Sequence, residues 1–189
     1  MAVAWAFGAG AGLASLAGFR AIIPLAVYII MAHLGWVWGF QVEDNPMDFI
    51  ISNAAAIVLL VLVLLEVLMT RIPALMRFER SLHLPLGLVS GALIATAAIA
   101  GEYPGAIHFI GILIGAVLAL VGGYVHNGLV MIGEGRDPGP AMDISVLVLS
   151  IMMMLVPPAG YVLTIVVLYL AARVRRLKKL KYKGLRVLA

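Results

Sequence analysis

The stretch from Phe49 to Met69 reads FIISNAAAIVLLVLVLLEVLM, and its only charged residue is Glu66. A helix needs about 20 apolar residues to cross the roughly 30 Å hydrocarbon core of a bilayer, and this stretch has that length. The whole chain has the same character, because 64% of its 189 residues are hydrophobic, 12% are charged and the mean hydropathy is +1.13. A globule of 20.1 kDa is mostly surface and cannot bury such an excess. The composition predicts an integral membrane protein and excludes a soluble enzyme or a disordered chain.

Four further apolar segments lie on either side of this stretch. Leu84–Ala100 and Ala106–Tyr124 each have the length of one crossing. Ala2–Leu34 and Asp143–Ala172 are too long for one crossing. The sequence therefore predicts an all-α, polytopic membrane protein with three full transmembrane helices and two broken or re-entrant helical elements.

Both long segments contain residues that interrupt helices. The first is interrupted at Gly18 and again at Pro24, and the second at Pro157 and Pro158. Proline removes a backbone donor and clashes with the preceding turn, so a straight helix through these positions is disfavoured. Each segment is expected to form either a kinked, tilted helix or a hairpin of two half-length helices.

The basic residues are concentrated at the C-terminal end. Of the 13 lysines and arginines, eight lie in residues 173–189, and the other 172 residues carry five basic and nine acidic side chains. This distribution predicts one transmembrane domain over 1–172 and a basic tail over 173–189 that contacts anionic lipid, with no binding of nucleic acid. The basic residues of the tail are Arg173, Arg175, Arg176, Lys178, Lys179, Lys181, Lys183 and Arg186.

The loop charges predict an orientation. The linker 35–48 is acidic and the linker 70–83 is basic, and short basic loops stay in the cytoplasm. If 70–83 and the tail are both cytoplasmic, Asp143–Ala172 enters and leaves the bilayer on one face, which favours the hairpin. Residues 71–83 are expected to lie on the cytoplasmic surface as an amphipathic stretch. The expected location is the bacterial inner membrane, with a cytoplasmic C-terminus.

Arg20 is the most informative single residue, because it lies deep inside an otherwise uncharged run. A charge near the bilayer centre costs about 2.5–3.5 kcal/mol on insertion scales, so such residues usually carry a function or a partner. Arg20 could bind an anion or a lipid headgroup beside the broken helix. Alternatively, it caps the carbonyls freed by the break or extends to the membrane interface.

Two acidic residues could interact with nearby groups. Glu66 lies about one turn before Arg71 and is expected to pair with Arg71 or Arg77 near the interface. The alternative is that it is the counter-charge of Arg20 or carries a proton. Asp143 is expected to cap the helix that follows it.

Small residues form two stripes that predict close helix packing. Gly8 and Gly12 share one face of the first segment. Another stripe combines glycines with two histidines that lie too far apart to share a metal: His108, Gly111, Gly115, Gly122 and His126. His126 and Asn127 are expected to open a cytoplasmic loop and to form a polar site there.

Catalytic signatures are not found in the sequence. It has no cysteine, no nucleophile with a partnered base, no phosphate-binding loop and no paired-histidine zinc pattern. The chain is therefore expected to be no enzyme and to use no cofactor and no metal.

The residues GFRAIIPL at 18–25 resemble a bacterial membrane family known as domain of unknown function 4126. The resemblance continues through Leu65-Glu66, Arg71-Ile72-Pro73 and Leu84-Pro85, and it covers most of residues 8–170. In that family an acidic residue is expected where Thr70 stands and a basic one where Leu84 stands. The resemblance implies a membrane topology and draws attention to Arg20, Pro24 and Glu66, and it implies no substrate.

Two functions fit these features. The first is a small transporter or channel for an anionic solute or a lipid phosphate headgroup, with a substrate site at Arg20, Pro24, Glu66, His126 and Asn127. The second is a non-catalytic accessory subunit that packs through its glycine stripes against a larger membrane complex. A homo-oligomer is compatible with both functions.

Overall fold

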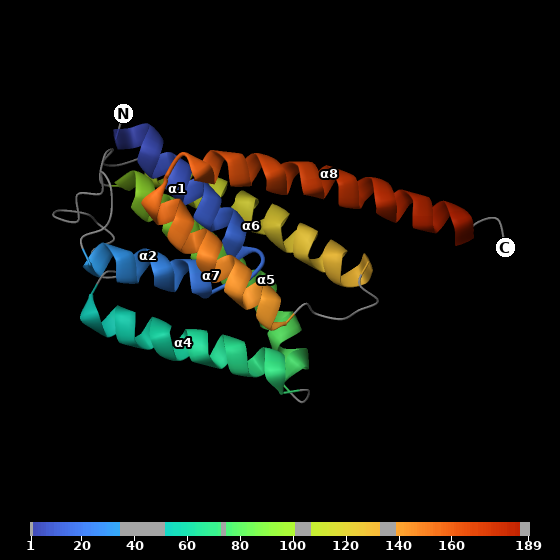
Figure 1. Cartoon of the computed structure of the whole chain (residues 1–189), viewed down its shortest axis with the longest axis horizontal. Helices are drawn as coiled ribbons and strands as arrows, with labels where there is room; N and C mark the ends of the chain where they lie inside the picture. Colours follow the sequence, from blue (N-terminus) through green and yellow to red (C-terminus); the bar gives the residue numbers. More distant parts are fainter. Residues whose placement is uncertain (1, 35–51, 73–74, 101–106, 133–138, 186–189) are drawn as a thin grey trace.

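The computed structural model describes residues 2–34, 52–72, 75–100, 107–132 and 139–185. These residues form seven α-helices and no strand, so the described part of the chain is all-α (Figure 1). The helices are α1 (Ala2–Ala17), α2 (Ile23–His33), α4 (Asn53–Arg71), α5 (Met76–Ala100), α6 (Ile107–Ile132), α7 (Pro140–Leu155) and α8 (Ala159–Leu185).

Three helices are long and apolar enough to cross a membrane, which suggests a membrane protein. Their apolar windows are Asn53–Arg71, Ser81–Ile99 and His108–Met131, in α4, α5 and α6. The C-terminal part of the stretch 71–83 forms the first turns of α5, which begins at Met76 and continues without a break into its apolar part. One prediction about the ends of these helices was wrong. His126 and Asn127 open no loop, because α6 continues to Ile132.

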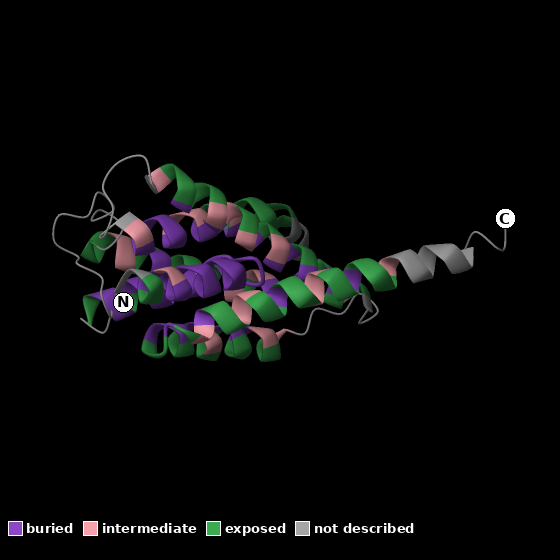
Figure 2. Ribbon diagram, turned by 90° about the horizontal axis from the view of Figure 1, so that it is seen from above, coloured by how far each residue is buried: buried purple, intermediate pink, exposed green. Residues whose placement is uncertain are grey.

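Helix α1 is the centre of the fold, with contacts to α2, α5, α6, α7 and α8. It consists largely of alanine and glycine, with Ser15 and two leucines also buried on it. Small side chains allow neighbouring helices to approach closely on all sides. Figure 2 shows the buried residues concentrated in the middle of the bundle, whereas the outer helices expose apolar side chains.

Each long apolar segment is divided into two helices. Residues 18–22 separate α1 from α2, and the two helices run in opposite directions in Figure 1. Residues 156–158 separate α7 from α8 in the same way. Pro24 is no second interruption, because it stands in the first turn of α2. Proline is favoured there, since the first residues of a helix have no carbonyl partner for their amides.

Several glycines are located where backbones touch. A Cβ on Gly160 would lie 1.9 Å from the carbonyl oxygen of Gly8, so α8 packs directly on α1. A Cβ on Gly115 would lie 2.1 Å from the carbonyl oxygen of Gly91, which brings α6 equally close to α5. Gly111 contacts Thr96 of α5 in the same seam. These faces are therefore covered by helices of the same chain.

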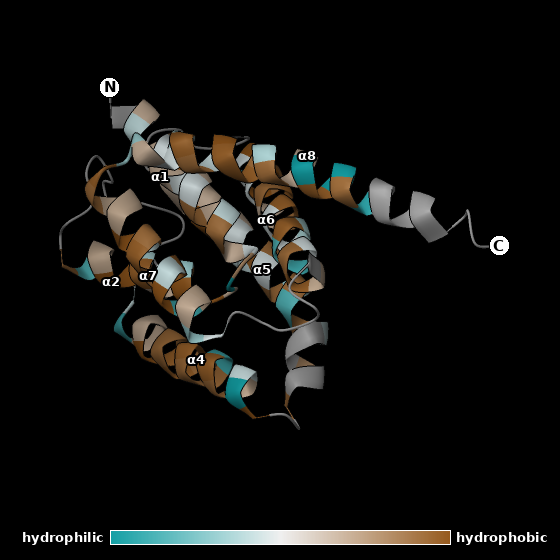
Figure 3. Cartoon of the chain, turned by 45° about the vertical axis from the view of Figure 1, so that its right-hand side comes forward, coloured by the Kyte–Doolittle hydropathy of each residue, from teal (hydrophilic) through white to brown (hydrophobic). Residues whose placement is uncertain are grey.

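The basic end of α8 points in the same direction as the α4–α5 connection. In Figure 1, α4 ends, α5 and α7 begin and α8 ends toward the right-hand side. Figure 3 shows that the first half of α8 is mostly apolar and that hydrophilic residues follow toward its C-terminal end. Arg173, Arg175 and Arg176 are exposed on this part of α8, and the Lys178 ammonium lies 4.5 Å from the centre of the Tyr124 ring.

Candidate functional site

The turn between α1 and α2 positions Arg20. The last turn of α1 is closed by amide groups of Phe19 and Arg20, which both donate to the carbonyl of Leu16 at 2.8 and 3.1 Å. Gly18 fits against α6, where a Cβ would lie 2.1 Å from the carbonyl oxygen of Ala119. The backbone therefore turns while pressed against a neighbouring helix. This arrangement leaves the Arg20 side chain fully buried, with an exposed fraction of 0%.

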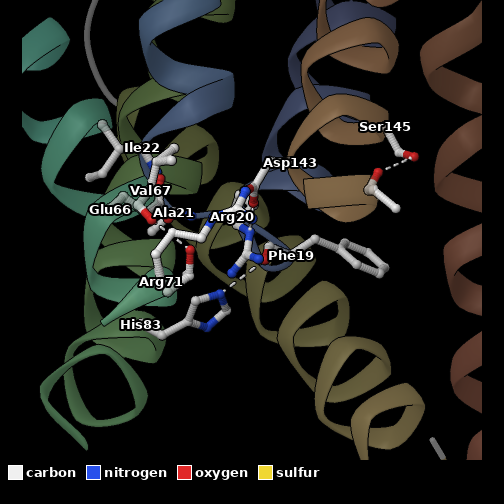
Figure 4. Close-up of polar contacts among 12 residues, drawn as sticks. Phe19, Arg20, Ala21, Ile22, Glu66, Val67, Arg71, His83, Asp143 and Ser145 are labelled. Carbon is white, nitrogen blue, oxygen red and sulfur yellow. Dashed lines mark hydrogen bonds and ion pairs between the residues drawn. The ribbon is translucent and has the colours of Figure 1, made fainter. Parts of the chain in front are cut away.

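Asp143 of α7 neutralises Arg20. Its Oδ1 accepts a hydrogen bond from Arg20 Nε at 2.5 Å (Figure 4). Its Oδ2 accepts one from Arg71 Nη2 at 3.2 Å. The exposed fractions of the side chains rise from 0% for Arg20 through 12% for Asp143 to 42% for Arg71. One carboxylate thus connects a buried guanidinium to one that reaches the surface.

Glu66 of α4 holds the other side of the same turn. Its Oε1 accepts a hydrogen bond from the amide of Ala21 at 2.6 Å, and its Oε2 accepts one from the amide of Ile22 at 3.1 Å. These amides directly precede α2, where the helix dipole favours negative charge. Hydrogen bonds to an ionised carboxylate are stronger than neutral ones. Glu66 therefore fixes the start of α2 to α4.

His83 of α5 holds the residue before Arg20. Its Nε2 donates to the carbonyl of Phe19 at 3.0 Å, and because a carbonyl only accepts, Nε2 carries the proton. The ring of His126 from α6 stacks on His83 with centroids 5.0 Å apart. Phe19 meets the His126 ring edge-on at 6.3 Å. Side chains from four helices, α4, α5, α6 and α7, thus surround the turn.

A small pocket lies beside the turn, between α4 and α5. It has a volume of about 50 Å³, and Ala21, Ile22, Glu66 and His83 are among the residues that line it. Its outer walls include leucines that are exposed on the outside of the bundle, so the pocket opens between the two helices. These are Leu62, Leu65, Leu82 and Leu86.

A family comparison covers the entire site. The model of a domain of unknown function, DUF4126, matches residues 7–177. The chain belongs to the DUF4126 family. This confirms the family resemblance of GFRAIIPL at 18–25, and the match extends over all the residues that surround Arg20. No curated protein and no solved structure matches this DUF4126 chain.

The structure brings some predicted site residues of this DUF4126 protein together and separates others. Arg20, Pro24 and Glu66 lie at or beside one turn, and His126 reaches it through His83. Asn127 is exposed on α6. Of the breaks, Gly18 borders the turn, whereas Pro157 and Pro158 precede α8.

The sequence interpretation missed three residues of the site: Arg71, His83 and Asp143. The prediction that Asp143 caps a helix was wrong, because α7 begins at Pro140 after Gly139, and Asp143 lies within its first turn. Glu66 bonds to backbone amides and not to Arg71, which binds Asp143 instead. The high cost of an isolated buried charge was the signal that a carboxylate partner for Arg20 had to exist.

Within the described ranges, no three histidine, aspartate or glutamate side chains are grouped so that they could hold a metal ion. The loop 133–138, whose charges follow α6 in the sequence, lies outside the described residues.

Proposed function

We propose that this chain is a polytopic inner-membrane transporter or channel for a small oxyanion, either free or as a lipid phosphate headgroup. Helices α4, α5 and α6 cross the bilayer fully, and α1–α2 and α7–α8 form hairpins within it. The C-terminal end of α8 and the α4–α5 connection lie in the cytoplasm, where basic residues are favoured. Discontinuous helices that meet inside a bundle are a recurring design of transporter sites.

The observation that carries the proposal is the carboxylate of Asp143 between two guanidinium groups. Arginine pairs with carboxylate and phosphate oxygens through the same forked donors. Asp143 therefore occupies the position that a substrate oxyanion would take between Arg20 and Arg71. Its carboxylate keeps the buried cation neutral while no substrate is bound.

The rise in side-chain exposure from Arg20 to Arg71 suggests the route by which the anion enters. Arg71 is the exposed member, and it contacts the anion first. Displacement of Asp143 then transfers the anion to Arg20, which is buried. Movement of α7 away from the α1–α2 turn is the conformational step that this exchange requires.

Transport into vesicles of phosphatidylethanolamine and phosphatidylglycerol tests the proposal. One arm measures uptake of radiolabelled phosphate, sulfate and acetate, and the other measures transfer of a fluorescent phospholipid between leaflets. In whichever arm the wild-type protein is active, Arg20→Met is expected to abolish the transport and Arg71→Gln is expected to slow it several-fold. Arg176→Gln is the matched control, because it removes the same charge from an exposed position on α8. Activity in neither arm, or equal activity of Arg20→Met and wild type, contradicts the proposal.

The accessory-subunit hypothesis has less support. It relied on glycine faces that would be open to a partner, yet Gly8 and Gly12 face α8, and Gly111 and Gly115 face α5. Most contacts of α4 with the described helices are to α2 and α5. Its apolar outer side is what a lipid-facing helix requires. Purification of the chain in a fixed ratio with a second protein would favour the subunit hypothesis.

A further inference from the structure

Two titratable side chains hold the Arg20 turn from opposite ends. His83 binds the carbonyl of the residue before Arg20, and Glu66 binds the amides of the two residues after it. Both side chains are buried, with exposed fractions of 9% and 8%. Both also line the pocket that opens between α4 and α5.

We propose that Glu66 and the pocket beside it form the proton-binding site that couples the transporter to a proton gradient. This inference rests on the proposed function and adds the coupling ion to it. Buried Asp, Glu and His side chains are the usual proton carriers of membrane transporters. The pocket, whose walls are almost entirely apolar, connects the outside of the bundle with the residues beside Glu66.

Protonation changes the contacts that Glu66 can make. The ionised carboxylate accepts from two amides, one on each oxygen. When a proton binds to one oxygen, that oxygen becomes a hydroxyl donor, and the negative charge that faces the start of α2 disappears. The two hydrogen bonds are no longer charge-assisted, so the link between α4 and the turn weakens. The Arg20 turn is then released from α4 on the side of α2.

His83 holds the turn from α5 and lines the same pocket as Glu66. The ring of His126 stacks directly on His83 and stabilises its orientation.

The charged groups around Glu66 determine the sign of the coupling. Arg20 in the turn and His83 on α5 face it, and His126 of α6 lies behind His83. Asp143 of α7 holds Arg20, and Arg71 on α4 holds Asp143. While Glu66 is ionised, its negative charge acts on Arg20 together with that of Asp143, and an incoming anion is repelled. Neutralising Glu66 removes one negative charge, so proton binding favours anion binding, and by linkage anion binding favours proton binding.

The proton site is tested first without any anion. Acid–base difference infrared spectra of the protein in lipid nanodiscs should contain the band of a protonated carboxyl that Glu66→Gln removes. Glu43→Gln, which makes the same chemical change in the acidic linker 35–48, should leave that band in place. A spectrum that Glu66→Gln does not alter overturns the inference. Matching elution profiles of the variants in size-exclusion chromatography verify that each is folded.

Release of the turn is tested at one fixed, neutral pH. The chain has no cysteine, so Ala21→Cys supplies a single reporter in the turn. Labelling of this reporter by a water-soluble maleimide should become several-fold faster when Glu66→Gln is added, because glutamine mimics the neutral side chain. Ser145→Cys on the exposed face of α7 is the control, and its labelling should not respond to Glu66→Gln. Equal labelling of Ala21→Cys in both backgrounds overturns the inference.

Transport separates the two proposals. An inward proton gradient should accelerate wild-type phosphate uptake several-fold and leave the uptake of Glu66→Gln unchanged. Wild-type uptake that ignores the gradient overturns the proton coupling and leaves the transport function standing. Absence of uptake and of lipid transfer in every variant overturns the proposed function, whereas the infrared result still decides whether Glu66 binds a proton.

Discussion

Neutralising Asp143 should reveal how strongly the fold depends on the buried ion pair. Asp143→Asn keeps the shape of the side chain and removes its charge, so the fully buried Arg20 loses the carboxylate that lies 2.5 Å from its Nε. Loss of one partner of a buried pair costs about 3–5 kcal/mol, and because the amide oxygen still accepts a hydrogen bond, we expect about 3 kcal/mol. Equilibrium unfolding with increasing SDS in mixed micelles measures this free energy.

Arg71, the second arginine that Asp143 binds, allows the costs of a buried and an exposed ion pair to be compared in the same protein. The Arg71 side chain is 42% exposed, and its Nη2 lies 3.2 Å from Asp143 Oδ2. Arg71→Gln should therefore lower the free energy of unfolding by only about 0–1 kcal/mol, as the loss of an exposed ion pair does. The double variant Arg20→Met/Asp143→Leu replaces the buried pair by apolar groups and should be more stable than Asp143→Asn alone. Equal costs for Asp143→Asn and Arg71→Gln would refute the view that burial gives this ion pair its importance.

Four smaller predictions concern the helices around the turn. Gly122→Ala should destabilise the protein by about 1–3 kcal/mol, because its Cβ would lie 2.1 Å from the rigid carbonyl oxygen of Ser15. The neighbouring Gly123→Ala should be neutral or stabilising by up to about 1 kcal/mol, since the nearest atom is a leucine methyl group at 3.4 Å and alanine favours helices. Pro24→Ala should cost about 1–2 kcal/mol, because the Pro24 ring is fully buried and alanine leaves part of its space empty, even though the first turn of a helix does not require proline. His83→Phe should cost about 1–3 kcal/mol by leaving the carbonyl that it binds without a donor. The same SDS titrations test all of these values, and a cost for Gly123→Ala as large as that for Gly122→Ala would contradict the packing described for α6.

The sequence was sufficient to predict the class of fold and most helix positions. Long apolar runs predict α4, α5 and α6 because the length of a bilayer crossing is fixed by its thickness. The end of α6 was predicted too early, at Tyr124, because a histidine followed by an asparagine is typical of a loop. In the structure His126 is buried against His83, so a tertiary contact overrides the local polarity.

The site could be predicted only in part, because its ion pair is also a tertiary contact that leaves no local pattern in the sequence. Arg20 and Glu66 stand out because each interrupts an apolar run. Their partners do not, since Asp143 lies in the first turn of a helix, where an acidic residue is ordinary. The sequence separation of 123 residues between Arg20 and Asp143 gives no local pattern that would link them.

That separation has a consequence for how the chain is made. Ribosomes add about 5–20 residues per second, so Asp143 leaves the peptidyl-transferase centre roughly 6–25 s after Arg20. During this interval the nascent α1–α2 hairpin carries Arg20 before its partner Asp143 exists, and α8, which will cover Gly8, has not been synthesised either. The N-terminal pair of helices therefore cannot complete its packing until α7 and α8 have been synthesised. It becomes the core of the protein only when the C-terminal hairpin arrives.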